Sequence, residues 1–409
     1  MEAAPKKLGD LVDGTSASSE QPQRAIIDGI PPFSLPYQYM FCSIMTRRDL
    51  RPGSLIGRMS EVRDTGGRGM TRRMMIAVAV AAVALLGSCV YAQENHSGKP
   101  AHCAELEQDL FIDLKEVVKA GCTPSKAQID RLLDNPIGNL VAIPFQYDYI
   151  TVKGPRISDS KSIQRLQITP TFPISLDRDW NLINRVVFPF LSMPFNKGFG
   201  DLIGMAPSGI LSSPTFQAAL QDPFDRTSGF GDMVYVGVVA PKKSVKIEST
   251  GGVFLWGVGA TAMLPTASEN ILGTGKYSLG PTGVLGYLGK EWLFGIFPQH
   301  WWSVGGGSGR SNVNCTNLQY FLYYSPPGWD PEAAWKFGMS PNITIDWAAE
   351  GDKVTFPVGL GVSRMVEIAG LPVNVAGEVY YSVIHPDDKL GSRWDARLYF
   401  TVVIPTFMF

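Results

Sequence analysis

Apolar and polar residues alternate along most of the chain after residue 139. In one early segment the apolar positions are Val141, Ile143, Phe145, Tyr147 and Tyr149. In the last segment they are Trp394, Ala396, Leu398, Phe400 and Val402. A period of two is that of a β-strand, whose successive side chains point to opposite faces. Each such strand is therefore predicted to separate an apolar medium from a polar one.

Segments with this pattern recur about twelve times, and each has the length of about 9–11 residues or more that crosses a bilayer when the strand is tilted. They cover residues 139–152, 163–177, 180–193, 230–241, 250–265, 277–289, 291–304, 316–325, 334–347, 353–366, 371–384 and 392–409. The sequence predicts an all-β protein, a transmembrane antiparallel up-and-down β-barrel of about 12 strands over residues 136–409.

The connections between these segments alternate in length. The short ones are 177–179, 289–290 and 368–370, and the long ones are 153–162, 194–229, 266–276, 305–315 and 385–391. Barrels of the outer membrane have short periplasmic turns and longer outer loops. The alternation therefore places both ends of the barrel in the periplasm, although 241–249, 326–333 and 348–352 fit it less well.

Tryptophans cluster near the ends of the predicted strands. They are Trp180, Trp256, Trp292, Trp301, Trp302, Trp335, Trp347 and Trp394. Interfacial aromatic girdles occupy these positions in membrane barrels. The alternative is core tryptophan in a β-sandwich.

A targeting segment precedes the strands. Arg72 and Arg73 are followed by an apolar run from Met74 to Leu86 and by small residues before Gln93, which is the pattern of a signal peptide over 70–92. A membrane anchor, or a lipoprotein signal ending at Cys89, would be alternatives. Residues 1–69 show no periodicity and are expected to be an over-extended gene start or a disordered terminus. We expect export by the Sec pathway.

Residues 93–135 are predicted to form a short helical segment before the barrel. Leu106, Leu110, Leu114 and Val117 make one apolar stripe, and Ser125 can cap a second helix. The segment could plug the barrel mouth, stay in the periplasm, or pack against the first strand. Cys103 and Cys122, in this same segment, are either bridged, as an oxidising periplasm favours, or unpaired.

The composition excludes some function classes. Charged residues make up 18% of the chain and the net charge is −1, so it lacks the basic face of a nucleic-acid binder. His96, His102, His300 and His385 are the histidines, no G-x-S-x-G motif accompanies them, and we expect no enzyme. Gly273–Lys276 departs from the phosphate-loop motif, since Tyr277 stands where that motif has the Ser or Thr that binds magnesium. We expect no cofactor, and no metal at His96, His102 and Cys103.

The polar face of the strands supplies the candidate site. Its residues are Gln146, Asp148, Arg165, Gln167, Arg185, Lys336, Asn342, Thr344, Asp346, Asn374, Glu378, Tyr380, Asp395 and Arg397. Ionisable groups facing lipid are unfavourable, so these side chains are predicted to line the lumen. They could form a closed network, or the wall of a water-filled path. A barrel of about twelve strands has more room than the eight-stranded case that side chains fill, which favours the path.

The segment 194–229 is the longest connection. Ile210, Leu211, Phe216, Leu220 and Phe224 lie there among prolines and small polar residues. It could constrict the lumen, cap the barrel, or be a surface loop with a short amphipathic helix.

Local motifs occur along the chain at Asp179–Ile183, Arg185, Pro189, Gly229–Asp232, Trp256–Gly259, Leu264–Ala267, Leu272–Lys276, Asn374, Tyr380–Val383 and Arg397. They resemble those of a bacterial family of outer-membrane transporters, some members of which carry the label neuromedin U. The likeness spans residues 135–409, although 194–229 is longer than is usual in that family. The chain is more distantly similar to barrels encoded beside phenol-degradation genes. The resemblance implies a barrel of transporter or channel type.

The expected function is that of a bacterial outer-membrane channel for passive passage of small solutes, hydrophobic or aromatic ones among them. A structural or adhesion barrel is the alternative, and an outer-membrane lipid hydrolase is less favoured. The expected partners are outer-membrane lipid and lipopolysaccharide, the small solute, and the barrel-assembly machinery through the C-terminal Phe409, with no nucleic acid.

Overall fold

A computed structural model describes residues 100–138, 140–155, 157, 159–201, 213–328, 334–368 and 371–404. The predicted segments 1–69 and 70–92, together with Phe409, lie outside the described residues.

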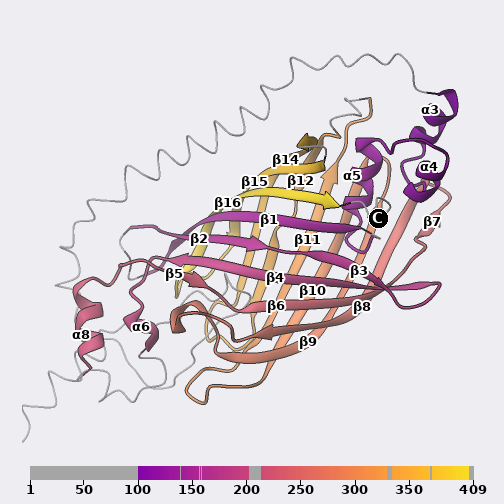
Figure 1. Ribbon diagram of the computed structural model, residues 1–409. Helices are drawn as coiled ribbons and strands as arrows, with labels where there is room; N and C mark the ends of the chain where they lie inside the picture. The colour runs from indigo at the N-terminus through magenta and orange to yellow at the C-terminus, as the bar shows by residue number, and fades with distance from the viewer. Residues whose placement is uncertain are drawn as a thin grey trace, which may run out of the picture.

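The described strands form one closed antiparallel barrel (Figure 1). They are β1 (Val141–Lys153), β2 (Lys161–Ile168), β3 (Thr171–Ser175), β4 (Trp180–Met193), β5 (Thr227–Phe230), β6 (Met233–Pro241), β7 (Val245–Ile247), β8 (Gly252–Leu264), β9 (Lys276–Leu288), β10 (Trp292–Gly306), β11 (Asn314–Tyr324), β12 (Lys336–Met339), β13 (Asn342–Asp346), β14 (Val354–Ile368), β15 (Leu371–Ile384) and β16 (Gly391–Ile404). The pieces β3, β5, β7 and β13 continue a neighbouring piece, so twelve strands surround the lumen, which confirms the predicted count.

Two of these interruptions contain prolines, at Pro170 and Pro341. Proline has no N–H and so removes a ladder hydrogen bond. The pairing nevertheless continues on one side, because the Val186 amide donates to the Pro170 carbonyl and the Tyr320 amide to the Pro341 carbonyl. The first and last strands close the barrel, with Val141 opposite Ile404 at one end and Lys153 opposite Gly391 at the other, and with one register shift between Thr151 and Val152.

The barrel has two ends, which we name by what they carry. The terminal mouth is the end where β1 begins and β16 ends, and the loop mouth is the opposite end, which carries the long segment between β4 and β5 (Figure 1). The short β3–β4 and β9–β10 turns lie at the terminal mouth, as the alternation of connection lengths predicts.

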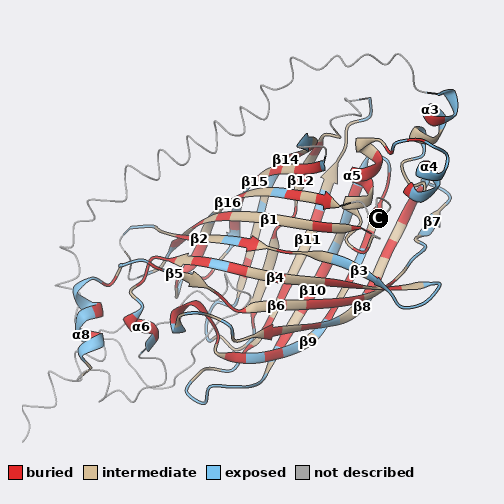
Figure 2. Ribbon diagram, in the orientation of Figure 1, coloured by how far each residue is buried: buried red, intermediate tan, exposed pale blue. Residues whose placement is uncertain are grey.

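Along the strands, buried, intermediate and exposed residues follow one another (Figure 2). The outward face of these strands is apolar. Its large side chains include Leu166, Phe172, Ile174, Phe190, Val258, Leu279, Leu285, Phe294, Ile296, Leu322, Leu360, Val379 and Phe400. Along the same strands buried residues alternate with these. Such an outward band is what a lipid environment requires of a barrel. Among the described residues, no helix is both long enough and apolar enough to cross a membrane.

Outward tryptophans gather near both mouths. At the loop mouth, Trp302, Trp347 and Trp394 are each about half exposed, and Trp292 is similarly exposed at the terminal mouth. Trp180 packs edge-on against Trp256, with ring centroids 5.7 Å apart. Trp301 does not join them. It is fully buried in the interior and donates from Nε1 to the Thr261 hydroxyl at 3.1 Å, so its predicted place in a girdle is wrong.

Part of the inner wall is apolar, which differs from the expectation of a polar lumen on every strand. The buried residues of this apolar wall come mainly from β4, β6, β8, β9 and β10, and include Ile183, Val187, Val234, Val236, Val238, Leu255, Val284, Leu288, Leu293, Phe297 and Trp301. The polar residues of the lumen lie chiefly on the remaining strands. The barrel interior therefore has two chemically different sides.

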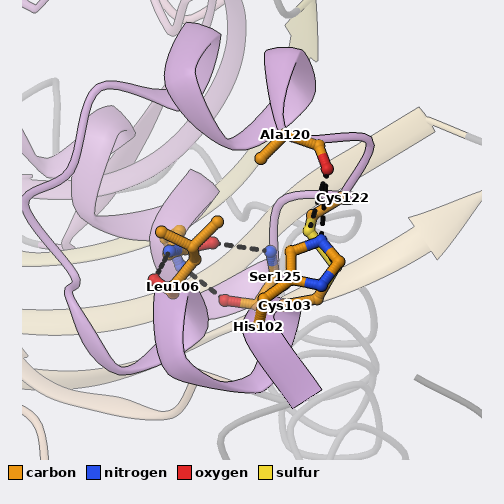
Figure 3. Close-up of a disulfide and its surroundings, with 7 residues drawn as sticks. His102, Cys103, Leu106, Ala120, Cys122 and Ser125 are labelled. Carbon is orange, nitrogen blue, oxygen red and sulfur yellow. Dashed lines mark hydrogen bonds between the residues drawn. A yellow bond between two sulfur atoms is a disulfide. The ribbon is translucent and has the colours of Figure 1, made fainter. Parts of the chain in front are cut away.

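Within the described residues, three helices precede the barrel, α3 (Ala101–Gln108), α4 (Leu114–Lys119) and α5 (Lys126–Asp134). A disulfide joins Cys103 to Cys122 over the buried Val117 (Figure 3). The Nε2 atom of His102 lies 3.2 Å from the Ala120 carbonyl oxygen beside it. Because both sulfurs are bonded to each other, they offer no thiolate to a metal beside His102.

Candidate functional site: the barrel lumen

The lumen contains a cavity that leaves about 950 Å³ unoccupied by atoms, including its part open to solvent. It is lined by Gln146, Ile150, Arg165, Gln167, Thr169, Arg185, Val187, Val236, Gln299, Asn317, Gln319, Asn342, Thr344, Thr355, Pro357, Ser382, Ser392, Asp395 and Arg397. The charged lining residues come from β2, β4 and β16, whereas β10, β11 and β13 supply neutral amides and a hydroxyl. A charged side of the lumen thus faces an amide side.

A carboxylate organises the charged side. Asp148 on β1 is completely buried, and its two oxygens bind Arg397 Nε at 2.6 Å and Arg165 Nε at 2.8 Å. The side-chain amide of Gln146 donates to both oxygens at 2.9 Å. Arg397 also pairs with Asp395, at 3.1 Å. The group is a network of charge-assisted hydrogen bonds, whose members hold one another in fixed positions.

A second network lies over β14. The Tyr323 hydroxyl donates to Glu378 Oε1 at 2.6 Å, and Tyr380 donates to the other carboxylate oxygen. The backbone N–H of Ser340 donates to the Tyr380 hydroxyl at 3.2 Å, and its carbonyl accepts from Arg397 Nη1 at 3.2 Å. These side chains therefore satisfy backbone groups at the interruption between β12 and β13, where pairing with β14 is missing.

Gly359 on β14 leaves room for the Tyr380 side chain to pass over this strand towards Ser340. A Cβ there would overlap the Val379 carbonyl oxygen and lie 2.6 Å from the Tyr380 ring. We expect Gly359→Ala to lower the free energy of unfolding by about 1–3 kcal/mol through overpacking. The matched control is Gly377→Ala, whose nearest neighbour is Leu398 Cδ2 at 3.6 Å. Urea unfolding followed by tryptophan fluorescence measures both, and equal losses would contradict the role of Gly359.

Arg185 on β4 differs from the other cavity arginines. Its guanidinium carbon lies 5.8 Å from the ring centroid of Phe297, on the apolar wall. Among the residues that the structure describes, Arg185 takes part in no ion pair and no hydrogen bond. The cation therefore faces the cavity between a polar side and an apolar one.

Helix α5 lies in the terminal mouth, against inward-facing residues of β12, β14 and β15 (Figure 1). Lys336 Nζ binds Asp130 Oδ1 at 3.0 Å and also Asp134, and the Asn374 amide donates to Asp130 at 3.2 Å. Burial raises the pKa of Asp130 to about 6, although the Lys336 charge opposes this. We call these contacts the latch, and α5 the plug helix.

Residues before, within and after the plug helix contact the apolar side of the lumen and the turn beside it. Ile137 is buried in the apolar wall, and Phe111 packs against the same wall. Arg131 donates to the Lys290 carbonyl in the β9–β10 turn. These contacts connect the plug helix to both sides of the barrel, so it fills part of the terminal mouth from inside, and does not simply pack against the first strand.

At the loop mouth, the segments that connect the strands pack together through apolar contacts. Helices α6 (Gly198–Asp201) and α8 (Pro214–Gln221) pack with the 3₁₀ turn η4 (Asn270–Leu272). Their buried cluster includes Phe199, Phe216, Ala219, Ile271, Leu272 and Leu390, together with Ile150, Leu191 and Met193 from the strand ends. Ile150 also lines the cavity. The described part of the 194–229 segment is therefore a cap with a short helix, resting on the upper rim of the lumen.

A buried carboxylate fastens this cap. Asp232 accepts from the Thr274 amide at 2.5 Å, from the Thr274 hydroxyl at 2.7 Å and from the Ala267 amide at 3.2 Å. Burial raises the pKa of Asp232, against the effect of these bonds. Arg310 donates from Nε to the Thr274 carbonyl at 2.9 Å. Since the Thr274 amide already serves Asp232, Gly273–Lys276 does not have the free amides of a phosphate loop.

The structure separates the predicted lumen residues into groups. Those on the cavity are Gln146, Arg165, Gln167, Arg185, Asn342, Thr344, Asp395 and Arg397. Asp148 lies buried behind them, Lys336 and Asn374 hold the plug helix, and Glu378 and Tyr380 cross β14. Asp346 is not on the cavity. It is the last residue of β13 and accepts a hydrogen bond from the Ala348 amide at 3.1 Å.

Other cavity residues are not identified by the sequence pattern. They are Ile150, Thr169, Val187, Val236, Gln299, Asn317, Gln319, Thr355, Pro357, Ser382 and Ser392. For Gln299 and Asn317 a signal is present, since each is polar on the inward register of a predicted strand.

The described histidines lack the partners of a serine hydrolase. His300 Nδ1 lies 2.8 Å from the Thr316 hydroxyl, which also accepts from Trp347. His385 faces Asp387 at 3.4 Å. No serine hydroxyl is among the partners that the described residues give His102, His300 or His385.

Comparison with known proteins gives similarity to solved structures only. No protein-family model matches the chain, and no curated protein matches it. An outer membrane channel of Pseudomonas putida F1 is 13% identical, with a TM-score of 0.41, over 65% of this chain and 96% of that one. Outer membrane phospholipase A of Escherichia coli is 12% identical, with a TM-score of 0.33, over 70% and 100%. A FadL homologue of Pseudomonas aeruginosa is 8% identical, with a TM-score of 0.29, over 64% and 89%. These proteins differ in activity, and none lends its activity to this chain.

Proposed function

We propose that the chain is a bacterial outer-membrane channel through which small solutes, hydrophobic or aromatic ones among them, pass by diffusion. The observation that carries the proposal is the cavity inside a closed barrel whose outward face is apolar. A polar path through an apolar medium is what this arrangement can provide. Because one side of the lumen is polar and the other apolar, it suits solutes that have both an apolar body and a polar group.

Both ends of the path are covered by segments that are not part of the barrel wall. The plug helix occupies the terminal mouth through the latch and through apolar contacts of Ile129 with the barrel wall, and α6 and α8 lie at the loop mouth in an apolar cluster. The proposed channel opens when one or both segments move. The proposal includes outer-membrane lipid and lipopolysaccharide around the outward face, export by the Sec pathway, and recognition of Phe409 by the barrel-assembly machinery.

Planar-bilayer recordings and liposome swelling with the refolded full chain test the channel. We expect discrete current steps, and swelling with solutes such as small sugars and benzyl alcohol. Absence of both current and uptake, from protein shown to be folded by its heat-dependent gel mobility, would overturn the proposal and leave a structural or adhesion barrel.

Deletion of 196–226 separates the channel from an adhesion barrel further. Because the described part of this segment packs with Ile150, which lines the cavity, its removal is expected to raise single-channel conductance about twofold or more, by clearing the loop mouth. In an adhesion barrel the same deletion would abolish surface binding and leave conductance unchanged. Gel mobility again confirms that the shortened chain is folded.

A further inference from the structure

We propose that Arg185 and the ring of Phe297 form a binding site for small organic anions, in which a carboxylate binds the guanidinium and an apolar or aromatic body lies on the apolar wall. This inference rests on the proposed channel for its place on a permeation path. The binding itself is a separate property, which can be measured whether or not the protein conducts.

The charges around the cavity favour an anion. Three guanidinium groups belong to the cavity and its charged side, those of Arg165, Arg185 and Arg397, against the carboxylates of Asp148 and Asp395. Asp148 is shared by Arg165 and Arg397, and Asp395 is held by Arg397. Arg185 is the guanidinium of the three that no carboxylate of the described residues pairs. Arg185 is therefore the cation of these three that is available to a solute.

The guanidinium suits a carboxylate in particular. It stays protonated, and its planar fork donates two parallel N–H bonds to two carboxylate oxygens. A desolvated cation of this kind gains much more from an anion than one in bulk water does. Arg185 makes no hydrogen bond to the described residues that a solute would first have to break.

The surroundings of Arg185 supply the second half of the site. Phe297 lies 5.8 Å from its guanidinium carbon, and Val187 and Val236 line the cavity beside it. A solute whose carboxylate binds Arg185 would place its body against Val187 and Val236, where burial of apolar area adds affinity. The amides of Gln299 and Asn317, also on the cavity, can bind a hydroxyl on the solute. An aromatic or branched carboxylic acid has this combination of groups.

Calorimetric titration of the folded full chain in detergent tests the binding, with benzoate as the anionic probe and benzyl alcohol as its neutral counterpart. We expect benzoate to bind the natural chain, Arg185→Gln to weaken benzoate binding at least about tenfold, and Arg185→Lys to keep part of it. Benzyl alcohol should bind the natural chain and Arg185→Gln equally. The control is Arg393→Gln, whose guanidinium pairs with the exposed Asp387 at 2.6 Å, and which should bind benzoate unchanged.

Reversal potentials in a potassium chloride gradient test whether Arg185 also affects which ions permeate. We expect chloride to be preferred by the natural chain and the preference to fall at least about threefold in Arg185→Gln. Benzoate bound equally by the natural chain and Arg185→Gln, or not bound at all, would overturn the site. Benzoate binding that depends on Arg185 in a protein without any current would uphold the site and overturn the channel instead.

Discussion

Replacing Asp148 by alanine is expected to lower the free energy of unfolding of the barrel by about 3–5 kcal/mol, one of the two largest effects predicted for a single residue here. The carboxylate is fully buried and binds both Arg165 and Arg397, whose side chains are 11% and 4% exposed. Its removal leaves two guanidinium groups close together without the anion between them. Like charges in a poorly solvated site repel strongly, and each loses its hydrogen-bond acceptor.

Urea unfolding of the refolded protein in lipid vesicles measures this loss. Asp148→Asn keeps the shape and removes the charge, so a loss as large as that of the alanine variant assigns the effect to the charge. Adding Arg165→Met to Asp148→Ala should recover part of the stability, because one unpaired cation is then gone. The matched control is Asp387→Ala, which breaks the exposed pair with Arg393 and should lose at most about 1 kcal/mol. Equal losses in Asp148→Ala and Asp387→Ala would contradict the network.

The strands could be predicted from the sequence because apolar residues that face lipid alternate in it with polar residues that face the lumen. On β16, Trp394 to Val402 face outward at alternate positions, while Asp395 and Arg397 face the lumen. A one-residue shift would turn these charges to the apolar side, so the register is fixed by the residues themselves. The same alternation predicts that Gln146 and Arg165 face the lumen, and both side chains are among those that line the cavity.

The apolar wall could not be predicted in this way. On β6, Val234, Val236 and Val238 face inward, but Val239 faces outward and is apolar too. A strand with two apolar faces shows no alternation that tells the lumen from the lipid. The prediction for Trp301 is wrong for a different reason. It rests on nearness to a strand end, whereas Trp301 has the inward register of Gln299, two positions earlier.

Contacts between distant segments are equally invisible in the sequence. Lys336 and Asp130 are 206 positions apart, and their pairing depends on where the plug helix sits in the closed barrel. The sequence pattern shows only that Lys336 is an inward cation and that Asp130 belongs to a short helix. The close approach of Tyr380 to Gly359 likewise follows from the pairing of β14 with β15, which places the two residues opposite each other.

The latch leads to the other large expected effect, an opening of the terminal mouth in Lys336→Ala. Lys336 is 5% exposed and binds two carboxylates of the plug helix. Without it, Asp130 and Asp134 are buried beside each other with no cation from the barrel wall, which costs about 3 kcal/mol or more. A change of about 3 kcal/mol shifts the balance between docked and released helix about 100-fold towards release. We expect a correspondingly higher open probability in bilayer recordings, and faster amide hydrogen exchange in residues 126–134.

Two further variants show whether the lost charge or the lost side chain releases the helix. Lys336→Arg keeps a cation in reach of both carboxylates, so its open probability should stay near that of the natural chain. Asp130→Asn combined with Lys336→Met removes one of the two carboxylates that Lys336 binds and leaves Asp134 paired with Arg131 at 3.4 Å. It should restore part of the docking, because an amide can still accept from Asn374, which lies 3.2 Å from Asp130. Slow exchange over residues 126–134 in Lys336→Ala, with currents like those of the natural chain, would mean that the apolar contacts of Ile129, Leu132 and Ile137 hold the helix without the latch. Fast exchange without any rise in current would instead place the barrier to solutes at the loop mouth, under α6 and α8.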